Sequence, residues 1–256
     1  MFPPRVYLTF DLEEFDIVQE FGTTISWQQQ IAVSVEGMQL LNPLLNKHEA
    51  TATFFTTAAF AKEQPELVYN LAQDHEIASH TYWHSSFEAV DLRNSLITLR
   101  EISGQPIEGL RMPRMRQVNI DLIKAAGYTY DSSINPTRLP GRYNYTHLPK
   151  TSFYQEGLLR IPASVSNFMR LPLFWLAFKN YPYPLYLQLA KKALMSQGYL
   201  NLYFHPWEFA HLTPFSLPWY IKKPSGTVLL SRLDRLLSDL APHATFHQLK
   251  NFQHQQ

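Results

Sequence analysis

Residues 6–15 read VYLTFDLEEF, an apolar run that turns acidic at Asp11. The β-branched and aromatic side chains of residues 6–10 favour a buried strand, and the carboxylates that follow mark its end. Similar short runs recur along the chain and alternate with segments of helical periodicity. This alternation is typical of βα units that surround a parallel sheet or barrel.

Apolar runs of this kind predict strands at 6–10, 51–55, 76–79, 109–112, 128–131, 158–162, 200–204 and 244–249. Helical patterns lie between them at 35–47, 66–73, 91–102, 120–126, 185–196 and 228–240. No repeat, low-complexity tract or linker-like change of composition divides the chain. We therefore expect a single α/β domain over residues 1–256, built as a barrel of seven or eight strands.

The composition limits the classes of function. The 256 residues are 45% hydrophobic and 17% charged, as in a soluble globular domain. The formal net charge is +1 without a block of like charge, which argues against nucleic acid as a partner. Cysteine is absent, so disulfides, thiolate catalysis and cysteine-based zinc sites are excluded. Any metal must be held by His, Asp or Glu.

The N-terminal residues reach acidic positions before an apolar run long enough for a secretory signal develops, which predicts a cytoplasmic chain. Residues 171–189, LPLFWLAFKNYPYPLYLQL, are the most apolar stretch, but Lys179 and three prolines argue against a membrane-spanning helix. We expect this stretch to lie at the surface or to line a cleft. Together with the missing signal it suggests a membrane-proximal substrate, such as a lipid-linked precursor. Nothing in the sequence predicts an oligomeric state.

Ionisable residues follow several predicted strands at the point where each strand ends. They are Asp11, His80, Arg111, Asp131 and His205. In a parallel barrel the carboxyl ends of the strands meet at one mouth, where reacting groups converge. We therefore expect these five side chains to share one site.

Residues 80–84 read HTYWH, so that His80 and His84 are four positions apart. This spacing brings two imidazoles to one face of a helical turn and suits zinc, although a solvated helix start has the same pattern. Asp11, Glu13 and Glu14 form an acidic cluster at a neighbouring strand end. A carboxylate from that cluster would complete three protein ligands.

Each remaining residue has a structural and a functional interpretation. Asp11 either caps a turn or serves as metal ligand or general base. Arg111 is either a surface cation or the bidentate partner of that carboxylate. His205 is either a hydrogen-bonded core residue or the group that protonates a leaving amine, and Asp131 either starts a turn or orients His205. Aromatic residues make up 14% of the chain, which fits both a packed core and a glycan groove.

The ordered series of motifs resembles the metal-dependent polysaccharide deacetylases, which share the nodulation deacetylase homology domain of carbohydrate esterase family 4. The matching segments are Thr9 to Asp11, His80 to His84, Arg111 to Pro113, Asp131 to Ser133, and Leu202 to His205. The HPWE sequence at 205–208 and the DSS sequence at 131–133 resemble the exopolysaccharide-associated subgroup.

This resemblance implies a distorted (β/α) barrel and a hydrolase that removes N-acetyl groups from an amino sugar in a glycan. The site residues would be His80 and His84 as ligands of a divalent metal, with zinc the expected ion, Asp11 as general base, Arg111 as its positioning residue, His205 as general acid and Asp131 as the partner of His205. The expected binding partner would be the saccharide substrate.

Two positions depart from the family pattern. The usual first motif has two adjacent aspartates, the second a metal ligand, whereas Leu12 occupies that place here and Glu13 follows. Three arrangements of the metal site are then open: Glu13 reaches the metal with its longer side chain, Asp11 itself is the ligand, or two histidines and water bind the metal more weakly. We favour Glu13, because two residues along an extended exit restore the facing direction of Asp11. Arg114 replaces a common aromatic and binds an acidic sugar group or faces solvent.

Two other functions compete with saccharide N-deacetylation. The first is a non-saccharide amidase that acts on a small ureide or imide, since relatives with this fold open such rings and a fold does not fix a substrate. The second is a catalytically silent carbohydrate-binding homologue that has lost its metal.

Overall fold

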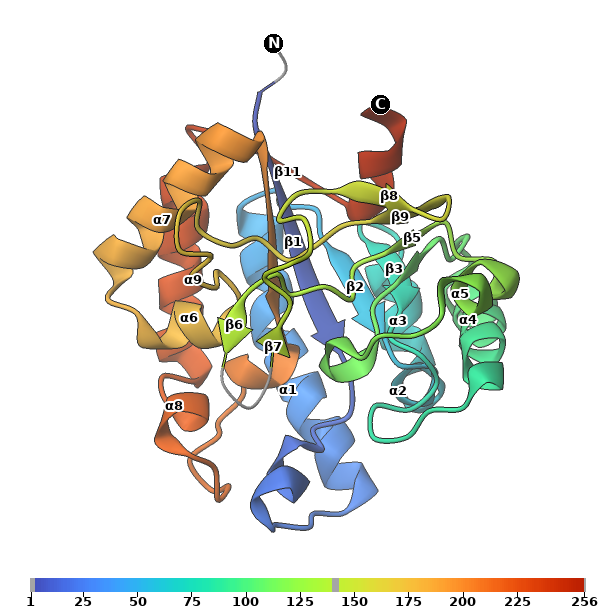
Figure 1. The fold of residues 1–256 in the computed structure, drawn as a ribbon. Helices are drawn as coiled ribbons and strands as arrows, with labels where there is room; N and C mark the ends of the chain where they lie inside the picture. The colour runs from blue at the N-terminus through green and yellow to red at the C-terminus, as the bar shows by residue number, and fades with distance from the viewer. Residues whose placement is uncertain (1–2, 140–142, 256) are drawn as a thin grey trace.

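The computed structural model describes residues 3–139 and 143–255. A curled sheet of order β10-β1-β2-β3-β4-β5-β9-β8 forms its centre, and β11 pairs with β1 beside β2 (Figure 1). The strands are β1 (Arg5–Leu12), β2 (Thr53–Thr56), β3 (Glu76–Ser79), β4 (Gly109–Leu110), β5 (Tyr130–Asp131), β8 (Phe153–Gln155), β9 (Leu158–Arg160), β10 (Tyr199–Phe204) and β11 (Thr245–His247). All of these pairings are parallel except β8 with β9. A separate antiparallel pair joins β6 (Arg138–Leu139) to β7 (Tyr143–Asn144).

Strand β1 is the longest of the described strands and pairs with three others. It pairs with β10 along one edge, and along the other edge with β11 in its first half and β2 in its second half. Successive side chains of a strand point to opposite faces. Leu8, Phe10 and Leu12 therefore pack in the larger hydrophobic core, whereas Tyr7 belongs to the smaller cluster inside the barrel. Asp11 continues the alternation that Tyr7 begins.

The barrel closes without a strand ladder between β9 and β10 in the described part of the chain. Ser164 and Asn201 instead bond in both directions, from Ser164 N to Asn201 O at 2.9 Å and from Asn201 N to Ser164 Oγ at 2.8 Å. The Asn201 side chain also donates to the carbonyl groups of Ile161 and Pro162 at 3.3 and 3.1 Å. These bonds satisfy backbone groups that a regular ladder would have paired. The expected distorted (β/α) barrel is thereby confirmed.

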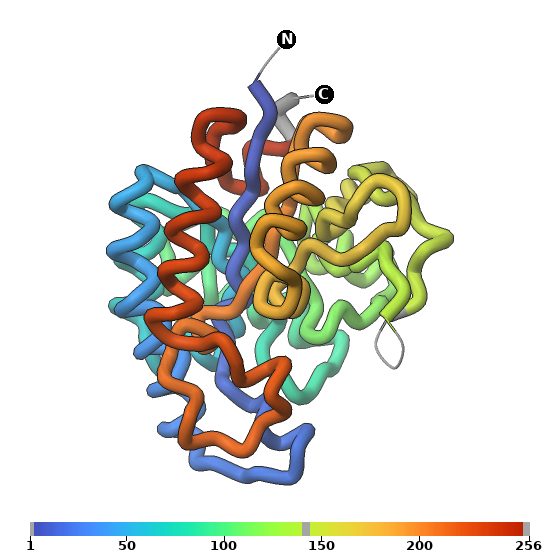
Figure 2. Tube along the Cα trace, turned by 90° about the vertical axis from the view of Figure 1, so that its left-hand side faces the viewer, coloured from blue at the N-terminus to red at the C-terminus, as the bar shows by residue number. Residues whose placement is uncertain are grey.

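Helices cover the outside of the sheet. They are α1 (Trp27–Lys47), α2 (Ala58–Glu63), α3 (Pro65–Leu71), α4 (Ala89–Ser103), α5 (Ile120–Ala126), α6 (Trp175–Asn180), α7 (Tyr183–Gln197), α8 (Trp219–Lys222) and α9 (Gly226–Leu240), with short 3-10 turns η1 (Ile17–Phe21), η2 (Pro113–Met115), η3 (Pro206–Phe209) and η4 (Leu249–Gln255). In Figure 1, α2 to α5 lie on one side of β1 and α6 to α9 on the other. Figure 2 shows α1 and α9, from opposite ends of the sequence, side by side. No helix within 3–139 or 143–255 is long and apolar enough to cross a membrane.

The end of the barrel where β1 begins is closed by η4. The buried Glu76 carboxylate at the start of β3 accepts hydrogen bonds from Thr53 Oγ1 at 2.6 Å, Tyr130 Oη at 2.9 Å and Lys250 N at 2.9 Å. Burial raises the pKa of Glu76, against the hydrogen bonds that lower it. This plugged end leaves the carboxyl ends of the strands as the open mouth.

Helix α1 packs closely on η3 at Gly37. A Cβ atom at this position would overlap the carbonyl oxygen of Pro206. We expect Gly37→Ala to lower the free energy of unfolding by about 1–3 kcal/mol, because an overpacked interface forces the backbone to shift. Urea denaturation measures this, and Ala32→Gly on the exposed face of α1 calibrates the propensity effect of about 1 kcal/mol. A Gly37→Ala protein stabilised by that propensity would contradict the close packing.

The predicted strands are confirmed within a few residues, and the unpredicted elements are short. Helix α1 begins at Trp27 instead of 35, because Ser26 and Gln29 form a capping box there. The sequence did not predict α2, α6, α8 or the strands β6 to β8, whose two to six residues carry too little periodicity. Residues 171–189 include α6 and the first half of α7. Trp175 lines a pocket, but Leu173, Phe174, Phe178 and Tyr186 are buried in the hydrophobic core, so the expectation of a surface or cleft-lining stretch was largely wrong.

Candidate active site

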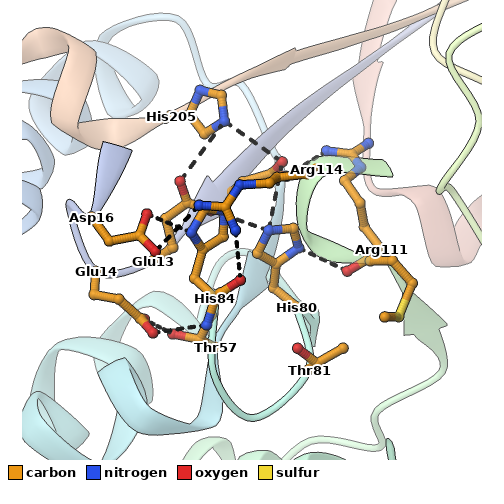
Figure 3. Close-up of polar contacts among 12 residues, drawn as sticks. Glu13, Glu14, Asp16, Thr57, His80, Thr81, His84, Arg111, Arg114 and His205 are labelled. Carbon is orange, nitrogen blue, oxygen red and sulfur yellow. Dashed lines mark hydrogen bonds and ion pairs between the residues drawn. The ribbon is translucent and has the colours of Figure 1, made fainter. Parts of the chain in front are cut away.

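A pocket opens at the carboxyl ends of the strands, opposite η4. Its polar lining includes Asp11, Glu13, His80, His84 and His205. The structure thus brings together three of the five strand-end residues predicted to share a site, and Arg111 contacts two of them, Asp11 through its side chain and His80 through its carbonyl oxygen. Figure 3 shows how the imidazoles of His80 and His84 face Glu13.

Glu13 completes a three-residue donor set with the two histidines. Its Oε2 atom lies 3.1 Å from His80 Nε2 and 3.2 Å from His84 Nε2, and the three donor atoms lie within 4.8 Å of one another. Among the residues that the structure describes, this buried Oε2 atom has no hydrogen-bond partner, an arrangement that a cation would satisfy. Leu12 lies in the hydrophobic core and points away, as expected for alternate residues. One carboxylate and two imidazoles fit a catalytic zinc site.

Outer hydrogen bonds fix both histidine rings. His80 Nδ1 lies 2.7 Å from the carbonyl oxygen of Arg111, and His84 Nδ1 lies 2.6 Å from Asp16 Oδ1. Because both acceptors require a proton on Nδ1, each ring presents the lone pair of Nε2 to the site when neutral. Carbonyl and carboxylate partners of this kind set the tautomer of metal-binding histidines.

Residues 80–84 are not helical, so the prediction of a helical turn was wrong. They form an irregular loop after β3 with Thr81 at a positive φ of 62°. Glu14 supports this loop, since its carboxylate accepts from His84 N at 2.8 Å and from Thr57 Oγ1 at 2.6 Å. The two imidazoles stack with centroids 5.7 Å apart. Tertiary contacts of the loop, and not helix geometry, therefore bring the two imidazoles together.

Electrostatics of the site favour a protonated His84. Burial lowers the pKa of His84, but Glu13 and Asp16 outweigh it and raise the value to about 9. Burial likewise opposes ionisation of Glu13, yet its histidine neighbours hold its pKa far below the usual range. A metal that binds Nε2 of His84 must displace this proton.

We therefore expect zinc affinity to rise with pH. Below the His84 pKa of about 9, each pH unit should tighten zinc binding by about tenfold, because one proton is released per ion bound. Calorimetric titration in buffers of different ionisation enthalpy counts this proton. Asp16→Asn should move the plateau of affinity to lower pH, and a zinc affinity that is constant between pH 6 and 8 would contradict the assignment.

Arg111 holds Asp11 at the second wall of the pocket. Its fully buried guanidinium donates from Nη1 to Asp11 Oδ1 at 2.6 Å and from Nη2 to Ser132 Oγ at 3.0 Å. The contact to Asp11 is a single hydrogen bond and not the predicted bidentate pair, because Nε and Nη2 bond to Ser132. The other oxygen of Asp11, Oδ2, lies 4.0 Å from His80 Nε2 and faces the site.

His205 follows β10 and faces Asp11 across the pocket. Its Nε2 atom lies 3.8 Å from Asp11 Oδ2 and 4.0 Å from Glu13 Oε1. Burial lowers the pKa of His205, but the hydrogen bond to Glu208 and the charges of Glu13 and Asp11 outweigh it and leave the pKa raised. The ring is thus disposed to carry a proton toward the centre of the pocket.

Asp131 is not the partner of His205. Its carboxylate accepts from Arg160 Nε at 2.9 Å and from Ser133 N at 3.1 Å, whereas His205 Nδ1 lies 3.1 Å from Glu208 Oε1. Strand β5 is adjacent to β9, which carries Arg160, so the Asp131 carboxylate bonds to Arg160 on the neighbouring strand. Asp131 therefore braces the strand ends behind the pocket.

Sequence reasoning missed Asp16 and Glu208, the carboxylates that bond to His84 and His205. Glu208 had a signal, because it lies three residues after His205 and could cap the turn that begins there. Asp16 had none, since its contact with residue 84 depends on the loop conformation. Both act on the orientation of an imidazole.

Arg114 lies on the pocket wall, with its charge already paired. Its guanidinium bonds to Glu20 Oε1 at 2.7 Å and approaches Asp16 Oδ2 at 3.6 Å. Nη1 also donates to the carbonyl oxygen of His84 at 3.3 Å. The side chain is 39% exposed, so it does not face solvent alone. Because its charge is already paired, it is not an unpaired cation for an acidic sugar group. Three aromatic residues, Trp175, Tyr203 and Trp207, also line the pocket.

Comparison with known proteins identifies the family. Residues 3–130, half of the chain, match the family model described as polysaccharide deacetylase. The chain belongs to the polysaccharide deacetylase family.

Individual proteins resemble this chain in sequence or in fold. A chitooligosaccharide deacetylase of Sinorhizobium fredii (strain NBRC 101917 / NGR234) is 36% identical over 73 residues, 28% of this chain and 31% of the relative, so the match spans about a third of that protein. A polysaccharide deacetylase structure from Mycobacterium smegmatis superposes with a TM-score of 0.65 at 18% identity and covers 97% of this chain and 88% of that one. The Puue allantoinase superposes with a TM-score of 0.62 at 15% identity over 96% and 88%. The two structures establish the shared fold.

Proposed function

We propose that the protein is a metal-dependent hydrolase that removes N-acetyl groups from an amino sugar in a glycan or glycan precursor. The observation that carries this proposal is the meeting of two groups of residues in one pocket. Glu13, His80 and His84 form a donor set for a cation, and Asp11 Oδ2 and His205 Nε2 lie beside it in the same pocket. Membership of the polysaccharide deacetylase family supports the reaction class.

Glu13, His80 and His84 would hold the ion, and zinc is the one that their donor atoms suit best. When bound there, zinc supplies Lewis acidity toward an acyl oxygen and toward water. The protein contributes fixed ring orientations through Arg111 O and Asp16, so that little reorganisation accompanies binding.

Asp11 is proposed as the general base. Arg111 fixes one oxygen of its carboxylate, and Oδ2 remains directed at the site, 4.0 Å from His80 Nε2. This oxygen would take a proton from the water that attacks the amide carbonyl. The buried ion pair keeps the carboxylate oriented without consuming both of its oxygens.

His205 is proposed as the general acid. Its Nε2 atom lies 3.8 Å from Asp11 Oδ2, whereas Arg111 bonds to Oδ1, and it would donate its proton to the leaving amine. Neighbouring carboxylates raise its pKa, which maintains the protonated form that this step requires.

A sugar is the proposed substrate because aromatic faces and polar groups share the pocket wall. Trp175, Tyr203 and Trp207 present rings beside the ionisable residues, a combination that suits the apolar faces and polar edges of a pyranose. The chitooligosaccharide deacetylase relative supports an N-acetylglucosamine oligomer as first substrate. The HPWE and DSS sequences extend the proposal to an exopolysaccharide precursor.

Zinc analysis and acetate release together test the proposal. The purified protein, loaded with zinc and dialysed, should retain about one ion and release acetate from chitooligosaccharides, whereas a His80→Ala/His84→Ala variant should do neither. Bound zinc with opening of a ureide ring and no acetate would replace the proposal with amidase activity. A parent protein that binds chitooligosaccharides but fails to retain zinc at any loading concentration would identify a silent binding protein.

A further inference from the structure

Glu208 lies between His205 and a buried lysine. Its Oε1 atom accepts from His205 N at 2.8 Å and lies 3.1 Å from His205 Nδ1, and its Oε2 atom lies 3.7 Å from Lys179 Nζ. The Glu208 and Lys179 side chains are both fully buried. A lysine from α6 thus reaches a carboxylate on η3, directly behind the proposed general acid.

Burial of the Lys179 charge at this position is energetically unfavourable. Lys179 Nζ and Glu208 Oε2 have no hydrogen-bond partner among the described residues, so the ion pair is the main compensation for two buried charges. The ring of Trp175 adds a weaker contact, 6.0 Å from Nζ. A well-packed apolar side chain would commonly be as stable as such a pair. The pair therefore calls for an explanation other than stability.

The surroundings of His205 show what the pair does. Trp207 stacks on the imidazole with centroids 4.8 Å apart, and Trp175 meets its edge with centroids 5.2 Å apart. These rings confine the plane of the imidazole but do not distinguish its two nitrogens. Glu208 does, because its carboxylate accepts only from a protonated Nδ1, whereas Asp11 and Glu13 lie on the Nε2 side.

We infer that Glu208 and Lys179 are positioning residues for His205: Glu208 keeps a proton on Nδ1 in both the charged and the neutral ring, so that Nε2, which faces the pocket, is the nitrogen that gains and loses a proton, and Lys179 balances the charge of Glu208 and holds it in place. The catalytic part of this inference rests on the proposed function. The orientation of the ring does not. Glu208 thereby takes the role that the sequence motifs assign to Asp131.

Nitrogen NMR of histidine-labelled, zinc-loaded protein tests the orientation without substrate. Above the His205 pKa, the parent should show Nδ1 protonated and Nε2 unprotonated, with the signal assigned by its loss in His205→Gln. Glu208→Ala should shift the ring toward the Nε2-protonated tautomer, whereas Glu208→Gln, which keeps an acceptor oxygen, should largely restore the parental signal. Asp131→Asn should leave it unchanged. An unaltered tautomer in Glu208→Ala protein that retains zinc would overturn the inference.

Kinetics test the catalytic consequence. Glu208→Ala should lower kcat by about 10- to 100-fold with little change in KM, as for other residues that orient an active-site ligand, and Glu208→Gln should recover most of the loss. Lys179→Met should lower kcat by a smaller factor than Glu208→Ala does. A rise in KM alone would refute a positioning role. If the parent releases no acetate but the tautomer shifts as expected, the proposed function fails and the positioning of His205 stands.

Discussion

Replacing Asp11 with asparagine is expected to lower kcat for acetate release by about 10²–10⁴-fold, the usual contribution of a general base. The asparagine side chain keeps the size of Asp11 and one oxygen for Arg111, whose Nη1 lies 2.6 Å from Asp11 Oδ1. It lacks the basic oxygen that faces the pocket. Zinc content should remain at the parental level, because Asp11 is not part of the donor set.

Acetate assays and elemental analysis of the same protein sample separate the two roles of Asp11. Asp121→Asn, an exposed substitution of the same kind on α5, controls for the chemical change and should keep parental activity. Loss of zinc from Asp11→Asn would show that Asp11 is a ligand and not the base. Parental kcat with zinc retained would exclude Asp11 from proton transfer.

Replacing Glu13 with glutamine is expected to weaken zinc binding by more than about 100-fold, since even partners outside the ligand shell contribute about 10- to 100-fold. Glu13 is the single anionic member of the donor set, and its Oε2 atom meets both histidines within 3.2 Å. The neutral amide removes that charge and places a donor near the ion. Competition with a chromogenic chelator measures the affinity.

Glu13→Asp provides the matched comparison, because it keeps the charge but shortens the reach. Its zinc affinity should fall between those of the parent and Glu13→Gln. Parental zinc affinity in Glu13→Gln would refute the assignment of Glu13 and return the site to two histidines and water. Trp207 Nε1, which donates to Glu13 Oε1 at 3.1 Å, should hold the side chain in place in Glu13→Gln, which keeps an oxygen at that position.

The sheet was predictable because its strands are buried runs whose composition is independent of distant contacts. The run around Leu8 and Phe10 is apolar enough to specify a strand without knowledge of its neighbours. The closure of the barrel was not predictable, since it depends on the Asn201 side chain and the backbone of residues 161–164. The short helix α2 depends on Thr57, whose Oγ1 caps Phe60 N, and leaves no periodic pattern.

The site was predictable where position along a strand decides direction. Asp11 and Glu13 face the pocket because alternate residues of an extended chain share a side, and Leu12 between them lies in the core, as this alternation predicts. Pairings between side chains were not predictable in this way. The Asp131 carboxylate forms an ion pair with Arg160 and not with His205. The order of the motifs does not reveal that the neighbouring strand carries this arginine.

Anomalous X-ray diffraction from zinc-loaded crystals at the zinc absorption edge tests the central claim most directly. The account predicts one strong peak, bonded at about 2.0–2.2 Å to a Glu13 oxygen, His80 Nε2 and His84 Nε2. Asp11 should remain on Arg111. A peak bonded to Asp11 in place of Glu13, or no peak between the two histidines in zinc-loaded crystals, would contradict it.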